Sequence, residues 1–404
     1  MNNVQGNLFR PLILPNGLSL ENRFVLSPMV TNSSTSEGFV TDDDIAYAVR
    51  RAKSAPLQIT GAAYVTEYGQ LFEYGFSVSK DEDIPGLTKL AKAMKSKGAK
   101  AVLQLTHAGR FSSHTLARHG YVYGPSPMQL QSPYPHQVKE LTHKDILMII
   151  DEYVQATRRA IQAGFDGVEI SSAQRLLIQT FFSTFSNQRK DEYGPQTLTN
   201  RCRLGLEVFK AVQKVIREEA ESDFILGFRA TPEETRGSQI GYSIEEFMEF
   251  LEKILAIAQV DYLAIASWGH DVFRNTIRSE GVYKGQLVNQ VIFEHFGDRV
   301  PIMATGGINS ASKVFEALQH AHMVGASTPL VVDPEFLQKI KAKRSDQINL
   351  RIKVSDLEGL AIPKASFKDI VPLMDYGESL PKEAREVLEN FEAIIGRKDE
   401  IKCP

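Results

Sequence analysis

Eight short runs of apolar residues, many of them β-branched, recur along the chain, and longer segments of a different periodicity separate them. The runs are apolar at successive positions rather than at alternate ones, which is typical of strands that are covered on both faces. They span Arg23 to Met29, Leu57 to Val65, Lys100 to Leu105, Phe165 to Ser171, Phe224 to Ala230, Asp261 to Ser267, Val300 to Thr305 and His322 to Ser327. The pattern predicts eight strands of a parallel sheet or of a closed barrel.

The segments between the runs show helical periodicity. In Thr142 to Ala163 the apolar residues fall on one helical face, and Thr142 with Asp145 forms a capping-box pattern at the start. Ser243 and Glu246 repeat this pattern before another amphipathic segment. Eight strand-helix units predict an α/β fold of the (β/α)8 or TIM-barrel type. An open doubly wound sheet is the alternative, but no glycine-rich dinucleotide loop follows the first strand, which favours the barrel.

Long connections follow the third, fourth and fifth predicted strands, at residues 106–141, 172–199 and 231–242. Loops that leave the carboxyl ends of barrel strands build the active site, so we expect these loops to surround it. Leu8 to Asn22 carries Pro15-Asn16-Gly17 between apolar runs, which predicts an N-terminal hairpin at the opposite end. We expect residues 1–345 to form the barrel domain and residues 346–404 a C-terminal tail, packed on the barrel or on a partner subunit.

Composition narrows the class of protein. Of the 404 residues, 43% are hydrophobic and 24% charged, which excludes collagen-like and largely disordered chains. The formal net charge of −3, without a block of like charges, argues against nucleic acid or a membrane surface as a partner. We expect neither a membrane span nor a signal peptide. The two cysteines, Cys202 and Cys403, form no disulfide or metal pattern, so we expect a cytoplasmic protein without a metal site.

Polar and small residues at the predicted strand ends are the candidates for chemistry. Gln104 could exchange hydrogen bonds with a heterocycle, and Arg229 could neutralise a ring that becomes anionic on reduction. Gly306-Gly307 and Ser327-Thr328 end the seventh and eighth strands, where barrels bind phosphate. Each feature has a structural alternative: a tight turn for the glycines, a polar rim residue for Gln104 and an internal ion pair for Arg229. Together they favour a planar, phosphorylated cofactor.

A set of ordered motifs extends over about Leu8 to Pro334. The motifs are Leu8-Phe9-Arg10-Pro11, Leu20-Glu21-Asn22-Arg23, Ser27-Pro28-Met29, Gln104-Leu105, His107-Ala108-Gly109-Arg110, Ala163-Gly164-Phe165-Asp166-Gly167-Val168-Glu169-Ile170, Ser186-Asn187-Gln188-Arg189, Asp191-Glu192-Tyr193-Gly194 and Asn200-Arg201. In these motifs the sequence resembles the old yellow enzymes, the FMN-dependent NADH:flavin oxidoreductase and ene-reductase family.

The resemblance implies FMN across the barrel mouth and NADH or NADPH as the reductant of the flavin, which then passes a hydride to a small-molecule electron acceptor such as an enone or quinone. It implies that the backbone of Pro28, Met29 and Val30 lies beside the flavin together with Ala62. Gln104 would bond the pyrimidine edge of the ring, and Arg229 would stabilise negative charge there. Gly306, Gly307, Ser327 and Thr328 would bind the phosphate, and a homo-oligomer is compatible with the chain.

Several positions depart from the family pattern. The two donors that bond the substrate carbonyl are Ser171 and Gln174 here, and the proton-donating tyrosine is Leu176. Losing one oriented donor typically lowers a rate by about 10²–10³ and losing the acid by about 10²–10⁴. Ser327-Thr328 replaces the Gly-Arg of the phosphate site, and Val30 replaces a residue that often tunes the flavin. Histidines at positions 107, 114, 119 and 270 could supply a proton, although loop positions without catalytic function are the simpler interpretation.

Three hypotheses follow. The first is an FMN-dependent oxidoreductase of the old yellow enzyme type with an altered substrate pocket, in which Ser171 and Gln174 contact the acceptor. The second is a catalytically impaired barrel that acts as a flavin- or ligand-binding or interaction module. The third is a barrel that binds another phosphorylated ligand in the same mouth.

Overall fold

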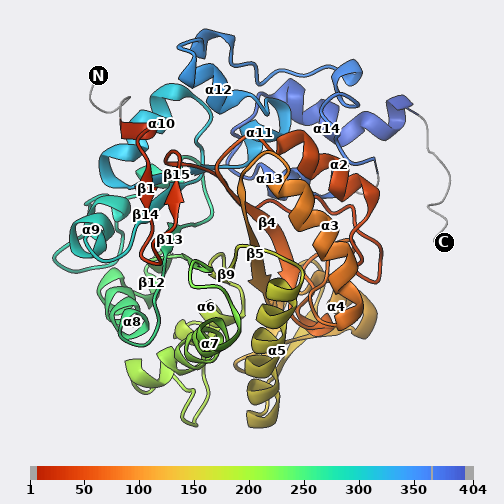
Figure 1. The fold of residues 1–404 in the computed structure, drawn as a ribbon. Coiled ribbons are helices and arrows are strands. Elements are labelled where there is room, and N and C mark those ends of the chain that lie inside the picture. The colour runs from red at the N-terminus through yellow and green to blue at the C-terminus, as the bar shows by residue number, and fades with distance from the viewer. Residues whose placement is uncertain (1–6, 365–366, 396–404) are drawn as a thin grey trace.

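The computed structural model describes residues 7–364 and 367–395, and its centre is a closed barrel of eight parallel strands surrounded by helices (Figure 1). The order around the barrel is β10-β13-β14-β15-β3-β4-β5-β9. The strands are β3 (Phe24–Leu26), β4 (Leu57–Tyr64), β5 (Lys100–Thr106), β9 (Gly167–Ser172), β10 (Ile225–Ala230), β13 (Tyr262–Ile265), β14 (Ile302–Thr305) and β15 (Met323–Ala326). Each coincides with one of the eight predicted runs, although β5 and β9 end one residue beyond the predicted bounds, and this agreement confirms the (β/α)8 barrel.

The first barrel strand is shorter than the predicted run. The sequence predicts a strand from Arg23 to Met29, whereas β3 ends at Leu26. Ser27 still donates its backbone N–H to Ala326 (3.0 Å), but Pro28 has no N–H with which to continue the ladder. The chain therefore turns at Pro28 and runs across the mouth of the barrel.

Helices cover the outside of the barrel in the expected alternation. Those between the strands are α2 (Asp42–Arg51), α3 (Ile84–Lys95), α5 (His143–Gln162), α7 (Leu198–Glu219), α8 (Ile244–Ile257), α9 (Val288–Phe296) and α10 (Ala311–Ala317). The capping boxes predicted from Thr142 with Asp145 and from Ser243 with Glu246 begin α5 and α8, as expected.

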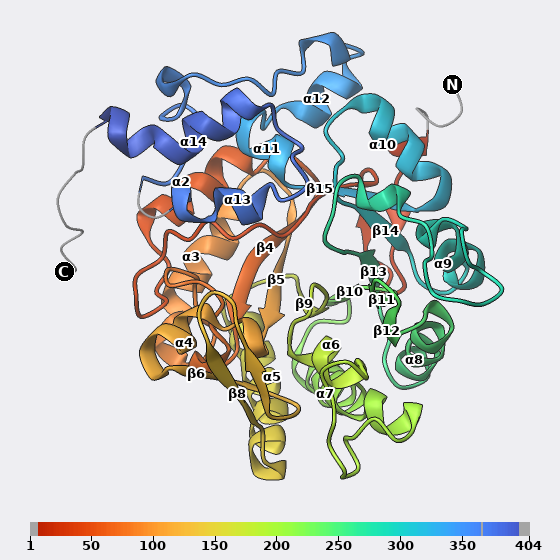
Figure 2. The same cartoon turned by 180° about the vertical axis from the view of Figure 1, so that it is seen from behind.

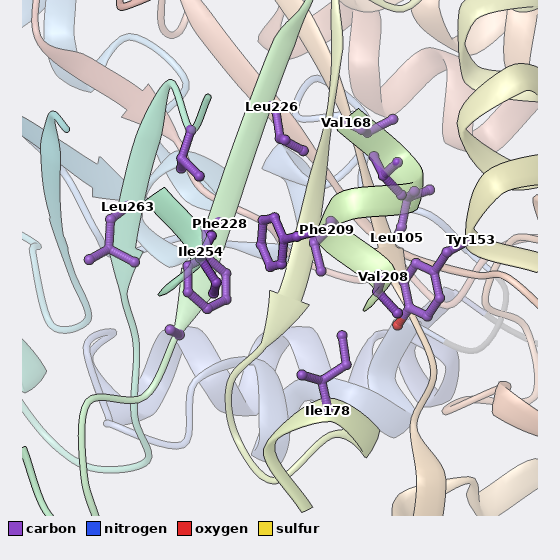
Figure 3. Close-up of a cluster of buried hydrophobic side chains, with 14 of the residues drawn as sticks. Leu105, Tyr153, Val168, Ile178, Val208, Phe209, Leu226, Phe228, Ile254 and Leu263 are labelled. Carbon is purple, nitrogen blue, oxygen red and sulfur yellow. The ribbon is translucent and has the colours of Figure 1, made fainter. Parts of the chain in front are cut away.

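Outward-facing strand residues and inward-facing helix residues form the largest hydrophobic core (Figure 3). Val168, Leu226 and Phe228 from the strands share this core with Phe209 of α7 and Ile254 of α8. The rings of Phe209 and Phe228 meet edge to face, with centroids 4.9 Å apart. This layer fixes the strands, and with them the positions of the residues at their carboxyl ends.

The N-terminal hairpin closes one end of the barrel, as predicted. Strands β1 (Leu12–Ile13) and β2 (Ser19–Leu20) pair antiparallel. Leu14 and Leu20 pack with inward residues of the barrel strands in a separate apolar core. Asn16, in the hairpin turn, donates its backbone N–H to the carboxylate of Asp261 (3.0 Å) and so ties the turn to the start of β13.

The long loops at the other end contain structure that the sequence pattern did not predict. The connection after β5 folds into a three-stranded sheet of β6 (Tyr121–Gly124), β7 (Met128–Leu130) and β8 (His136–Glu140), preceded by α4 (Ser113–His119). The connection after β9 contains α6 (Leu177–Phe182), and the one after β10 contains the hairpin β11 (Glu234–Arg236) and β12 (Gln239–Tyr242).

The chain after the barrel packs on it, with α11 (Thr328–Val332) and α12 (Phe336–Lys341) leading to α13 (Val371–Met374) and α14 (Lys382–Ile395) (Figure 2). Phe367, Val371 and Leu388 form an apolar core with Val331 and Val332 of α11. The predicted division at residue 345 stays a prediction.

No helix in the described part of the chain combines the length and apolar character that crossing a bilayer requires. Cys202 is buried and free, and Cys403 lies outside the described residues.

Candidate active site

A cavity of about 340 Å³ opens at the carboxyl ends of the barrel strands, at the end opposite the hairpin. Its walls include all twelve residues that the sequence analysis selected. These are Pro28, Met29, Val30, Ala62, Gln104, Ser171, Gln174, Arg229, Gly306, Gly307, Ser327 and Thr328. The barrel thus brings together residues from seven of its strand ends. The location is where enzymes of this fold carry their active sites.

The floor of the cavity contains Gln104 and Arg229, which form a buried polar cluster with Glu169 behind the lining residues. Gln104 and Glu169 are register partners on β5 and β9, and Gln104 Nε2 donates to Glu169 Oε1 (2.6 Å). Burial raises the pKa of Glu169, while Arg229 and Gln104 oppose this rise. Burial also lowers the pKa of Arg229, and Glu169 counters that effect. The two side chains therefore stabilise each other's charged forms.

This cluster leaves buried polar atoms without partners. Arg229 Nη1 and Glu169 Oε2 have no hydrogen-bond partner among the residues described. Leaving such atoms unsatisfied is costly, and they commonly mark a place where a ligand or water completes the bonding. Glu169 was not among the predicted site residues. Its position two residues before Ser171, on the same face of the strand, was the signal that could have revealed it.

One wall of the cavity is backbone that crosses from β3 toward β4. The register of β4 against β5 shifts between Ile59 and Ala62, which places Ala62 opposite Gln104. A Cβ atom on Gly61 would lie 2.5 Å from the carbonyl oxygen of Met29, so glycine is what allows the Met29-Val30 backbone to approach the strand.

Two glycines after β14 form another part of the wall. Gly306 and Gly307 have φ angles of +84° and +81°, which favour glycine. Ser327 and Thr328 follow β15 and also line the cavity. The family arginine is absent at this position, and a lysine, Lys313, donates from its Nζ to the Gly307 carbonyl (3.2 Å) and to Asp271 (2.6 Å).

The rim above the floor holds the residues that depart from the family pattern. Ser171 is buried at the end of β9, and Leu176 closes the same wall with an apolar side chain. Gln174 adopts a left-handed backbone (φ +57°), and its N–H donates to Thr231 Oγ1 (3.1 Å). The rim therefore offers a hydroxyl and an amide, and Leu176 can give no proton.

The C-terminal extension supplies part of the cavity that sequence reasoning missed. The lining residues from this segment are Ile370, Leu373, Met374, Asp375, Tyr376, Gly377 and Ser379. Tyr376 packs edge to face on Trp268 (centroids 5.2 Å apart), and His270 Nδ1 lies 2.8 Å from the Gly377 carbonyl oxygen. Asn309 Nδ2 donates to the Ser379 carbonyl (2.6 Å). These contacts hold the segment across the mouth.

The other histidines considered as proton donors do not line the cavity. His107 is buried after β5, where its Nδ1 accepts from the Gly109 N–H (3.0 Å), and burial lowers its pKa to about 4. It is therefore neutral at pH 7 and braces the loop. Among the residues described, no group of three or more histidine, cysteine or carboxylate side chains is placed to hold a metal ion.

Comparison with known proteins identifies the family. The family model for the NADH:flavin oxidoreductase / NADH oxidase family matches residues 7–347, and the chain belongs to this family. It is 66% identical, over 98% of both chains, to an uncharacterized oxidoreductase of Streptococcus pyogenes. It is 32% identical to a probable NADH-dependent flavin oxidoreductase of Bacillus subtilis, over 92% of this chain and 97% of the relative.

Solved structures show the same fold. The old yellow enzyme homologue from Zymomonas mobilis superimposes with a TM-score of 0.69, at 21% identity, over 83% of this chain and 92% of that chain. The resemblance to the old yellow enzymes that the sequence motifs indicated is thus confirmed at the level of family and fold.

Proposed function

We propose that this chain binds FMN in the mouth cavity and passes reducing equivalents from NADH or NADPH to an electron-poor small molecule. One observation carries the proposal: the residues selected for flavin contacts all line a single cavity, and the buried Arg229 Nη1 at its floor has no partner within the described part of the chain. Family membership and the NADH-dependent Bacillus relative support it.

The residues present fit FMN. Arg229 offers an unsatisfied donor and a positive charge to the electron-rich edge of a reduced ring, while Gln104 offers an amide. Gly306, Gly307, Ser327 and Thr328 offer backbone N–H groups and two hydroxyls for the phosphate. Bound FMN would supply the hydride chemistry, which the protein side chains cannot perform themselves.

The cluster of Gln104, Glu169 and Arg229 is already arranged to bind a flavin ring before a ligand binds. Because Gln104 Nε2 donates to Glu169, the carbonyl oxygen of the same amide is the end that can accept from a heterocycle. Glu169 in turn counters the lowering of the Arg229 pKa by burial and so favours the charged guanidinium. The positive charge is then available where negative charge develops on reduction, without reorganisation.

The rim favours acceptors that take their protons on oxygen. An enone needs a proton on carbon, and Leu176, which lines the cavity, replaces the tyrosine to which the family resemblance assigns that step. A quinone instead becomes a hydroquinone with both protons on oxygen, and these protons can come from water; NADH, one proton and quinone give NAD⁺ and hydroquinone. We therefore expect quinone-type acceptors to react faster than enones, by about 10²–10⁴ if the missing acid sets the difference.

The visible spectrum of the freshly purified protein tests the proposal. We expect flavin absorption, release of FMN on denaturation, and oxidation of NADH or NADPH with a naphthoquinone well above the rate of free FMN. A colourless protein that FMN cannot reconstitute would contradict the proposal. Flavin binding without NAD(P)H oxidation would instead favour the impaired binding module, which the replacements Ser171, Gln174 and Leu176 support.

The same preparation tests the remaining expectations. A thermal-shift screen of phosphorylated ligands would reveal a different occupant of the mouth if FMN does not bind. Sedimentation of the full chain would show whether it forms the homo-oligomer with which the sequence is compatible.

A further inference from the structure

The loop after β9 holds two consecutive non-glycine residues in the left-handed region. Gln174 has a φ of +57° and Arg175 a φ of +67°. This conformation is unfavourable for residues with a Cβ, so the surrounding structure must hold it. The Gln174 N–H donates to Thr231 Oγ1 (3.1 Å), and the Arg175 N–H donates to Gln179 Oε1 (2.6 Å). Backbone held in this way is typical of ligand-binding sites.

Arg175 lines a second cavity, of about 160 Å³, that adjoins the main one. Gln174, Ser267, Trp268 and Val272 belong to the walls of both cavities. A molecule in the main cavity could therefore extend a substituent past Gln174 to Arg175.

The two carboxylates that line this second cavity already accept hydrogen bonds. Glu233 accepts the backbone N–H groups of Arg278 (2.9 Å) and Ser279 (3.0 Å). Glu234 accepts from the guanidinium of Arg236 (2.7 Å). Both carboxylates thus already have partners.

The guanidinium groups of two arginines in this cavity are not matched in this way. Within residues 7–364 and 367–395, the side chains of Arg175 and Arg278 have no hydrogen-bond or ion-pair partner. Burial and then repulsion from Arg236 lower the pKa of Arg175, against the attraction of Glu234. The buried Arg110 adds to the positive charge around Arg175. The surroundings therefore carry more positive than negative charge.

We propose that Arg175 is the anchor of an anion-binding subsite at the rim of the active site. It would bind a carboxylate, sulfonate or phosphate group carried by one of the two reactants, the acceptor or the nicotinamide dinucleotide. A planar guanidinium matches such groups with two parallel hydrogen bonds. The inference rests on the proposed function, because it assigns the subsite to a reactant of that chemistry.

Direct binding tests the subsite without catalysis. Trp268 is the single tryptophan of the chain and lines both cavities, so its fluorescence reports ligands there. We expect benzoate to bind more tightly than benzamide, and Arg175→Gln to reduce this preference about tenfold. Arg175→Lys should retain part of the preference, because it keeps the charge but not the planar fork. Equal binding of benzoate and benzamide, or an unchanged preference in Arg175→Gln, would overturn the proposal.

Arg158→Gln is the matched control, because it removes one positive charge from α5, where Arg158 pairs with Glu219 (2.8 Å) and lines neither cavity. This variant should leave the benzoate preference unchanged. A fall as large as that of Arg175→Gln would show a general charge effect and would also overturn the proposal.

Steady-state kinetics identify which reactant carries the anion. The acceptors are 1,4-naphthoquinone and its 2-sulfonate, and the reductants are NADH and the uncharged 1-benzyl-1,4-dihydronicotinamide. A loss in Arg175→Gln confined to the sulfonate assigns the anion to the acceptor, and a loss confined to NADH assigns it to the reductant. Equal losses with all four compounds would contradict a subsite.

The two proposals can fail separately. A protein that neither binds FMN nor oxidises NADH, yet keeps the Arg175-dependent preference for benzoate, has the anion subsite without the proposed function. A flavin-dependent enzyme without that preference has the function without the subsite.

Discussion

The two ends of the barrel are built from the same strands but differ in chemistry. At the hairpin end, inward residues such as Ile59 and Val102 pack against Leu14 and Leu20 in a buried apolar core. At the mouth, the inward residues are Gln104, Glu169 and Arg229, and two of these side chains retain unsatisfied buried atoms. The comparison shows how one scaffold can confine its chemistry to one end of its axis, so that changes at the mouth should affect ligand binding and changes at the hairpin end should not.

The largest expected effect is at the mouth. Arg229→Leu leaves Glu169 buried without its positive partner, which we expect to destabilise the flavin-free protein by about 3–5 kcal/mol and to abolish flavin binding. The double variant Glu169→Gln/Arg229→Leu should recover much of the stability but not the flavin. Urea denaturation and flavin content measure the two effects. A single variant as stable as the double variant would show that the pair is not coupled.

The hairpin end should affect stability alone. Leu20 is 1% exposed, and Leu20→Ala should cost about 2–5 kcal/mol through lost burial and a cavity. Flavin affinity of the folded protein should stay unchanged. Ile13→Ala in the same hairpin is the control, because Ile13 is 69% exposed and its loss should change stability by less than about 0.5 kcal/mol. Weaker flavin binding in Leu20→Ala would contradict the separation.

Acid should act on the two ends in opposite directions. Burial raises the pKa of Asp261, which lies beside the hairpin, to about 6. The stabilising contribution of the protonated Asp261 carboxyl group is therefore present below about pH 4 and is lost as the pH rises through 6. Burial lowers the pKa of His107, beside the mouth, to about 4, so its contribution is present above about pH 6.5 and is lost as pH falls through 4. Each contribution is on the order of 3 kcal/mol.

Single variants should separate the opposing pH-dependent contributions of Asp261 and His107 to stability. Between pH 6.5 and 4, Asp261→Asn should lose stability on acidification more steeply than the unmodified protein, because the His107 contribution is then unopposed. His107→Gln should show the reverse. Denaturation midpoints measured at several pH values test both, and parallel curves for all three proteins would refute the assignment.

The smallest effect is at the rim. Arg175→Gly relieves the left-handed strain and should stabilise the protein by about 1 kcal/mol, while it removes the anion preference. Arg175→Ala removes the same charge but keeps the strained backbone, and so should not be stabilised. Thermal denaturation compares the two variants. Equal midpoints would mean that the loop carries no strain.

The sequence predicted what depends on strand periodicity. The eight strands, both capping boxes and the closing hairpin follow from local patterns, and the carboxyl ends of parallel strands necessarily meet at one face. The selected site residues therefore lie around one cavity. The register that pairs Gln104 with Glu169 required neighbouring strands to be aligned, which no local pattern specifies.

What the sequence did not predict depends on contacts between distant segments. Residues 370–379 carry no strand alternation, and their place over the mouth is set by partners such as Trp268 and Asn309. Similarly, the left-handed backbone at Gln174 and Arg175 depends on the bond from the Gln174 N–H to Thr231, which lies 57 residues further along the chain. Tertiary contacts determine these features, and the local conformational propensities of the residues do not.

The wall formed by Ile370 to Ser379 also has a consequence for biosynthesis. The barrel can close once β15, ending at Ala326, has been made, but the cavity lacks this wall until Ser379 has been added. At about 5–20 residues per second, roughly 3 to 10 s separate the two events on the ribosome. A nascent barrel would thus present an open mouth first, and the complete ligand site would form only after Ser379 has been added.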